Sequence, residues 1–590
     1  MRDRARVTPA LLRGLLVLLV VALTLGVCPL TAQPAVDGKV LVYQCVATAC
    51  VLIFLVGSWL ENESYCAPCA LFWLAAAFAG LNFAAVLVAV NVGHSLTEFS
   101  KWAALFLLFL VAAWSYRTPK QFRVFLWGVA AAMVVAAGSG LLEWVGIQPL
   151  GWLKAGKDGV GVSRVLGSAE AVSRGLLPAC ILSASLALRR GCRWALPIPV
   201  VLVVYGAVAG SWTAGVGLIA ACVCAGVSLT ARRRGMQPGV TVALVLVCVA
   251  VIGGAGMGAA WKLGARGDTA APESRWVDSV SGAARMVADK PLLGRGPGGY
   301  VIDRPLYWSA RDKERFAVSR ALVRHVGSEP LEIAVDAGLA ACAIYVAFLG
   351  LALAMAARMS LDRGDGERRW LGLTLVAFFG AAFVDGLLGA GLRAPVSAYL
   401  LFVVAGVLCG VRGLDSENPA IQAAPRALWR LLAACAALAI PLLATRMFLA
   451  RCELAAGRTA MQTEDYEAAQ KRFAAAADRV PHSWDAQYEL GMAYLKAGLP
   501  EEALSPLERA IENNPNHVEA LFALARAQFN VATKARGKKS EAFLDDALSY
   551  AQRAADLHAE LPESHDLMAC LLYTSPSPRD RTRSRMPSSA

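Results

Sequence analysis

The chain has 590 residues, of which 57% are hydrophobic and only 17% are charged, and its formal net charge at pH 7 is +13. This length is too great for one hydrophobic core, and this hydrophobic content is well above that of soluble globular domains. The excess positive charge sits in short loops between apolar runs and matches no nucleic-acid-binding motif, so the composition favours a membrane protein and argues against a nucleic-acid partner.

Apolar segments follow one another from the N-terminus to about residue 449. A transmembrane helix needs about 20 apolar residues. The arginine-rich start resembles a signal peptide, but the many later segments favour a retained first span. By length, about thirteen candidate spans lie near residues 11–30, 40–60, 70–92, 102–116, 122–146, 171–188, 195–210, 214–230, 240–260, 331–357, 370–390, 395–412 and 427–449. The seventh and eighth are short and are expected to form a helical hairpin or broken helices.

The basic residues of the short loops predict the orientation of these spans. Clusters lie at the N-terminus and at 117–123, 189–193, 232–234 and 358–369. With thirteen spans, all of them fall on one side, which the positive-inside rule assigns to the cytoplasm. The long polar interval 261–330 and everything beyond residue 449 then lie on the outer side.

Within the polar interval, the segment DKPLLGRGPGGY at 289–300 predicts a rigid turn. Its prolines fix φ, and its glycines permit backbone angles that other residues avoid. Exposed amides at Gly296 and Gly298, beside Arg295, would suit an anionic oxygen. A plain structural turn is the alternative. Farther on, Glu332 and Asp336 are four residues apart at the start of an apolar segment, which places both acids on one helix face.

Residues 450–570 repeat with a period of 34, the length of a tetratricopeptide unit. The period predicts an α-solenoid of paired helices that follows the membrane domain of residues 1–449. A third unit carries an insertion at 534–540, a fourth begins near Glu563, and residues 571–590 break the pattern and are interpreted as a disordered or artefactual tail. The positions that match the repeat are Gly457, Ala469, Phe473, Ala476, Pro481, Trp484, Leu490, Gly491, Tyr494, Ala503, Leu507, Ala510 and Pro515.

The membrane segments resemble the O-antigen ligase/polymerase family, bacterial inner-membrane enzymes that take a glycan from an undecaprenyl-diphosphate carrier. The resemblance rests on Trp276, on Met286 with the PLLGRGPGGY run, on EPLEIAVDAGL at 329–339 and on RVLGSAEAVSRGLLPA at 164–179. The chain departs from the family pattern at Asp336, where Glu is usual, at Trp212, where Arg is usual, and at Gly327, where His is usual.

The resemblance implies an inverting glycosyltransferase that uses no metal or other cofactor. Cations would stabilise the leaving phosphates, and a base would deprotonate the acceptor hydroxyl. It implies diphosphate or glycan contacts for Arg164, Arg275, Arg295, Gly296 and Gly298, and catalytic roles for His325, Glu332 and Asp336.

Under this interpretation the protein is a multi-pass protein of the bacterial inner (cytoplasmic) membrane, with the polar interval and the repeats in the periplasm. Its expected partners are the undecaprenyl-diphosphate-linked glycan, a lipid, polysaccharide or protein acceptor, membrane lipids and a protein bound through the repeats. Two other classes stay open, a non-catalytic scaffold of a surface-polysaccharide machine and a transporter of lipid-linked glycans. A transporter predicts internally repeated spans, a symmetry that this sequence lacks.

Overall fold

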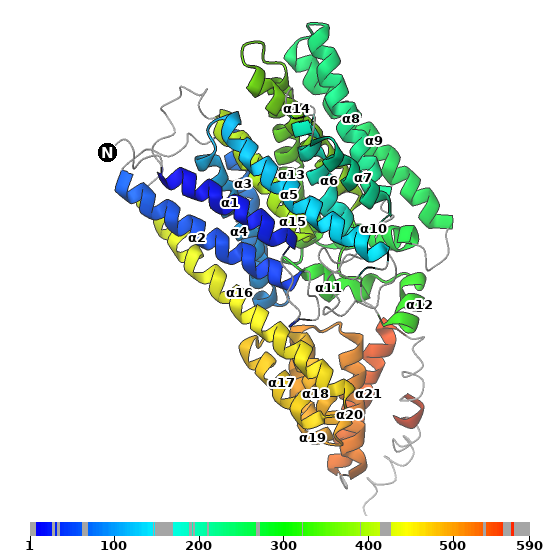
Figure 1. Cartoon of the computed structure of the whole chain (residues 1–590). Coiled ribbons are helices and arrows are strands. Elements are labelled where there is room, and N and C mark those ends of the chain that lie inside the picture. The colour runs from blue at the N-terminus through cyan, green and yellow to red at the C-terminus, as the bar shows by residue number, and fades with distance from the viewer. Residues whose placement is uncertain are drawn as a thin grey trace, which may run out of the picture.

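The computed structural model describes residues 7–25, 30–31, 36–61, 69–145, 147, 169–187, 192, 195–208, 212–266, 272–320, 323–389, 391–412, 426–534, 538–558 and 568–571. Within these ranges all regular secondary structure is helical, as the sequence predicts. The helices form a large bundle with a smaller helical array at one end (Figure 1).

Each apolar segment proposed as a span contains a helix. Nine of the described helices are long and apolar enough to cross a membrane, and shorter apolar helices lie at 70–86, 176–187, 197–206 and 395–411. Of the two segments expected to be short, α7 has 12 residues, whereas α8 has 22 and is long enough to span. The helices are α1 (Val7–Leu25), α2 (Asp37–Glu61), α3 (Ala70–Val86), α4 (Val92–Ser115), α5 (Pro119–Trp144), α6 (Ala169–Ala187), α7 (Pro197–Val208), α8 (Trp212–Arg233), α9 (Pro238–Arg266), α13 (Glu329–Ser360), α14 (Gly366–Leu388), α15 (Pro395–Arg412) and α16 (Arg426–Gln462).

The polar interval folds into short helices at the end of the bundle that faces the array (Figure 1). They are α10 (Pro272–Asp289), α11 (Gly299–Asp303), the 3-10 helix η3 (Arg304–Tyr307) and α12 (Ala310–Ser319). Met286, Tyr300 and Val326 are buried in a small core that this interval shares with α13. The Trp276 indole donates a hydrogen bond of 2.6 Å to the carbonyl oxygen of Gly327. The interval is therefore a packed cap on the bundle.

Helix α13 is interrupted at Gly338, and the glycine-rich turn at 289–298 fills the interruption. Gly338 has φ 86° and ψ 171°, a conformation that only glycine adopts readily. The interruption leaves α13 backbone groups without partners inside the helix, and the turn supplies them. Arg295 N donates to Val335 O at 2.9 Å, Gly296 N donates to Asp336 O at 2.9 Å, and Leu339 N donates to Pro291 O at 2.8 Å. The turn thus has a structural role, because it completes the hydrogen bonding of a broken apolar helix.

The smaller array consists of helix pairs stacked in chain order. Helix α16 runs from the last apolar segment into the first repeat, so the proposed domain boundary at 449 lies inside a continuous helix. A Cβ on Gly457 would lie 2.5 Å from the Phe473 ring, and one on Gly491 would lie 2.5 Å from Leu507. The two glycines occupy equivalent positions in consecutive repeats, and each lets the paired helices approach closely. The helices after α16 are α17 (Tyr466–Arg479), α18 (Trp484–Lys496), α19 (Pro500–Asn513), α20 (Val518–Lys534) and α21 (Lys538–Leu557).

Most of the predicted fourth unit and all but one residue of the proposed tail lie outside the described residues, which end with a helical turn at 568–571. In the third unit, α20 extends to Lys534 and α21 begins at Lys538, so part of the predicted insertion is helical.

The array is held against the bundle by polar contacts. Asn91, before α4, donates to the carbonyl oxygens of His482 at 2.9 Å and Asn513 at 3.1 Å. Asn516 donates to the Asp303 carboxylate at 3.0 Å. These bonds place the turn between α17 and α18 directly over the start of α4.

Candidate functional site

A buried arginine with three carboxylates around it lies at the end of the bundle that faces the array. Arg393 closes a short 3-10 helix, η4 (Gly391–Arg393), between α14 and α15. Its guanidinium is 3.1 Å from Glu332, 3.0 Å from Asp336 and 4.0 Å from Glu329, and it lies 5.5 Å from the Trp102 ring centroid. Burial lowers the pKa of Arg393, but the carboxylates outweigh burial and raise this pKa above its ordinary value. The arginine is therefore always charged.

Glu329, Glu332 and Asp336 all belong to the segment of α13 that precedes its interruption. Their spacing puts the three side chains on one helix face, and all three are buried. Glu332 and Asp336 therefore meet at the same cation, as their spacing in the sequence suggests.

Glu332 links this buried cluster to His325. One Glu332 oxygen lies 3.0 Å from His325 Nδ1, and the other accepts a hydrogen bond of 3.1 Å from the backbone N–H of Val326. The His325 side chain is 47% exposed. Gly327 has φ 77°, and a Cβ there would lie 2.9 Å from Trp276. Position 327 is thus closed to a side chain, and the histidine two residues earlier reaches the acid.

The cluster borders a cavity of about 310 Å³ between the bundle and the array. Besides Arg393, three of the lining cations have carboxylate partners: Lys101 lies 2.6 Å from Glu98, Arg458 lies 2.7 Å from Glu489, and Arg451 is paired with Asp37. Arg324 is exposed and has no carboxylate partner among the described residues, so it is available to an anionic ligand. The polar and aromatic lining includes Asp37, Tyr43, His94, Glu98, Lys101, Trp102, Tyr300, Arg324, His325, Glu332, Arg393, Arg451, Arg458, His482, Trp484 and Asp485.

The array contributes a wall of this cavity through the turn before α18. The Trp484 ring packs edge-on against His94 at a centroid distance of 4.6 Å. His482 Nε2 lies 3.3 Å from the Thr97 hydroxyl. Burial, reinforced by Arg446, lowers the pKa of His482, which favours its neutral form. The cavity is therefore complete only when the array is docked.

The sequence analysis proposed eight site residues, and the structure brings some of them together. His325, Glu332 and Gly298 line the cavity, and Asp336 contacts Arg393 behind its wall. Gly296 donates its amide to Asp336 O, so that amide is already engaged. Arg164 lies outside the described residues.

The two remaining arginines are placed differently. Arg295 is buried, pairs with Asp303 and donates to the Tyr307 hydroxyl at 2.6 Å, so it holds α11 and η3 together. Arg275 is exposed on α10 and is not among the residues that line the cavity. A cation that is paired inside the protein is poorly placed to bind a diphosphate.

Arg393 and Arg324 were not among the site residues proposed from the sequence. The signal for Arg393 was present, because it is a single charge in a short connection between two apolar segments, where charges are costly. The residues from the array carried no such signal, since their repeat positions are explained by helix packing.

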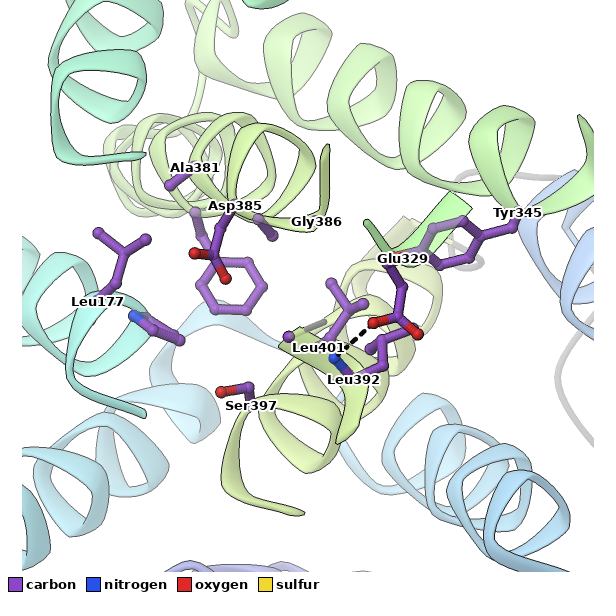
Figure 2. Close-up of a pocket in the computed structure, with 13 residues that line it drawn as sticks. Leu177, Glu329, Tyr345, Ala381, Asp385, Gly386, Leu392, Ser397 and Leu401 are labelled. Carbon is purple, nitrogen blue, oxygen red and sulfur yellow. Dashed lines mark hydrogen bonds between the residues drawn. The ribbon is translucent and has the colours of Figure 1, made fainter. Parts of the chain in front are cut away.

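A second, smaller cavity lies beside the cluster, inside the bundle (Figure 2). It measures about 40 Å³, which is room for one or a few water molecules. Asp385 of α14, Glu329 of α13 and Ser397 of α15 line it from three different sides (Figure 2). Glu329 accepts a hydrogen bond of 3.1 Å from the backbone N–H of Leu392. Among the described residues, no three His, Cys, Asp or Glu side chains are placed to hold a metal ion.

Comparison with protein families identifies the smaller array. A family model for the tetratricopeptide repeat matches residues 454–517 and 492–530. The helices within residues 454–530 are tetratricopeptide repeats. The match covers the end of α16 and runs into α20, as the period of 34 predicts. No curated protein matches the chain. The resemblance of the membrane segments to the O-antigen ligase family therefore stays a prediction.

Proposed function

We propose that this protein is a membrane glycosyltransferase that moves a glycan from an undecaprenyl-diphosphate carrier to an acceptor hydroxyl in the cavity between the bundle and the repeats. The observation that carries the proposal is the chain of contacts from Arg393 through Glu332 to the half-exposed His325, with the exposed cation Arg324 beside it. A base and a cation are the two groups that this transfer needs.

The geometry supports different roles for the two ring nitrogens of His325. In the tautomer that carries hydrogen on Nδ1, His325 donates a hydrogen bond to Glu332, and Nε2 is the proton acceptor. Nε2 takes the proton of the acceptor hydroxyl as its oxygen forms a bond to the anomeric carbon. The bond from that carbon to the phosphate oxygen breaks, and the diphosphate leaves with the electron pair. Arg324 stabilises the charge that develops on the phosphates.

The positions of the basic clusters support a periplasmic site in the bacterial inner membrane. The basic turns after α8 and after α13 adjoin each other, since a Cβ on Gly235 would lie 3.6 Å from Arg363. Both turns lie at the end of the bundle away from the repeats (Figure 1). A reporter that is active only outside the cytoplasm, fused after Gly457, should be active. A silent reporter would place the repeats in the cytoplasm and overturn the orientation.

Transfer by the purified protein in nanodiscs, with an undecaprenyl-diphosphate-linked glycan as donor, tests the reaction. Removing a general base typically costs about 10²–10⁴-fold in rate, and we expect a loss in that range for His325→Gln. Arg324→Gln should mainly weaken donor binding. Arg275→Gln is the matched control, because this exposed arginine does not line the cavity. Full activity of His325→Gln, or equal losses for Arg324→Gln and Arg275→Gln, would refute the assignment.

A non-catalytic scaffold is the second candidate, favoured by the repeats, since stacked helix pairs commonly bind proteins. The same preparation separates the candidates. Normal donor binding without transfer by the wild type would favour the scaffold. Movement of a labelled donor across the bilayer without transfer would favour a transporter.

A further inference from the structure

Helix α13 is longer than a bilayer requires. Its 32 residues exceed the roughly 20 that a hydrocarbon core requires. The part from Leu339 to Ser360 alone covers about 33 Å, enough for a hydrocarbon core of about 30 Å. If this part spans the hydrocarbon core, the interruption at Gly338 falls near the membrane surface.

The turn that fills this interruption carries exposed leucines at the same level. Leu292 is 80% exposed, Leu293 is 38% exposed and Leu339 is 52% exposed. The backbone bond from Leu339 N to Pro291 O makes the turn and the helix immediate neighbours. Scattered exposed leucines need no explanation, but a contiguous group at the edge of an apolar helix does.

The group continues along α13 as an apolar stripe. Leu339, Ala343 and Val346 recur at helical spacing on the exposed side of α13. Helix α13 is long and apolar enough to cross a membrane, and in a spanning α13 this exposed side would face lipid. Exposed Lys290 stands next to the leucines and has no carboxylate partner among the described residues, while the neighbouring Asp289 accepts a hydrogen bond from Tyr307.

We propose that the turn at 289–293 is a membrane anchor: Leu292 and Leu293 enter the hydrocarbon edge of the leaflet on the repeat side, and Lys290 meets anionic headgroups. The continuity with the lipid-facing stripe and the adjacent exposed cation point to lipid as the occupant. Through its bonds to Val335 and Asp336, the turn then holds the acidic face of α13 in a fixed position relative to the membrane surface. This inference requires only that α13 spans a membrane and does not depend on the glycosyltransferase proposal.

Quenching of a fluorescent amino acid placed at position 292 tests the anchor. The full-length protein is reconstituted in nanodiscs of phosphatidylethanolamine and phosphatidylglycerol, with either acyl-brominated lipid or aqueous iodide as quencher. The matched control carries the fluorophore at Val318 of α12, which is 85% exposed in the polar interval. Equal thermal unfolding midpoints for both labelled proteins exclude misfolding as the cause of a difference.

We expect the brominated lipid to quench position 292 several-fold more than position 318, and iodide to do the reverse. Equal access of iodide to both positions would place the turn in water and overturn the proposal. Protection of position 292 from both quenchers would mean that protein, such as a second copy, covers the turn, and would overturn it as well. As a second variant, Lys290→Glu should reduce the quenching at position 292 in nanodiscs that contain phosphatidylglycerol.

Discussion

Replacing Gly338 by alanine should strongly destabilise the bundle. At φ 86° and ψ 171° an alanine is strained, which costs about 1–3 kcal/mol. Its Cβ would also overlap the backbone carbonyl of Leu292, which cannot rotate away. The turn must then move and lose its three backbone bonds to α13, each worth about 0.5–1.5 kcal/mol net. Together these effects amount to about 2.5–7.5 kcal/mol.

Gly350→Ala in the same helix is the matched control. A Cβ on Gly350 would point into open space, and alanine is the better helix former by up to about 1 kcal/mol. Denaturant unfolding in mixed micelles gives the free energy of unfolding for both variants, and proteolysis within 289–298 reports release of the turn. If Gly338→Ala were within about 1 kcal/mol of Gly350→Ala and equally resistant to protease, the account of the broken helix would be wrong.

Three further outcomes are expected. Arg393→Met leaves the buried carboxylates without their cation and should lower the free energy of unfolding by about 3–5 kcal/mol, with a smaller decrease for Arg393→Lys. A decrease below about 1 kcal/mol for Arg393→Met would contradict the ion network. Gly93→Ala would place its Cβ 2.5 Å from the His482 ring, so hydrogen exchange at 481–485 should rise, whereas Gly80→Ala, with nothing within 4 Å, should leave it unchanged. Burial lowers the pKa of His482, so the unfolded state binds a proton more readily than the folded state. The stability that this site contributes is therefore full above about pH 6.5 and falls on acidification. Hydrogen exchange measured at pH 7.5 and 5.5 should show this pH dependence in the wild type and not in His482→Gln.

In addition to any binding of a protein partner, the repeats form part of the cavity wall. The turn before α18 closes the cavity over the start of α4, so loosening the repeats should open the site. The array thus contributes directly to the architecture of the site, independently of any protein that its exposed surface recruits.

The helical architecture and the repeats can be predicted from the amino-acid pattern alone. Apolar runs of about 20 residues have few folded solutions other than helices, and each predicted run contains one. The period of 34 placed Gly457 and Gly491 correctly, because close packing of paired helices leaves room for nothing larger. The shared face of Glu332 and Asp336 followed from helical spacing alone.

Which charged groups contact one another depends on how the helices pack. Arg393 and Asp336 are 57 positions apart, and their contact depends on how α13 packs beside η4, which no local pattern encodes. The glycine-rich turn looked like an anion site, because the sequence cannot reveal that its amides pair with a helix interrupted some forty residues later. Arg295 looked available for the same reason, since its partner Asp303 is brought to it by the fold of the interval. Local periodicity follows from the geometry of one helix, whereas the partner of a buried charge is chosen by the packing of several.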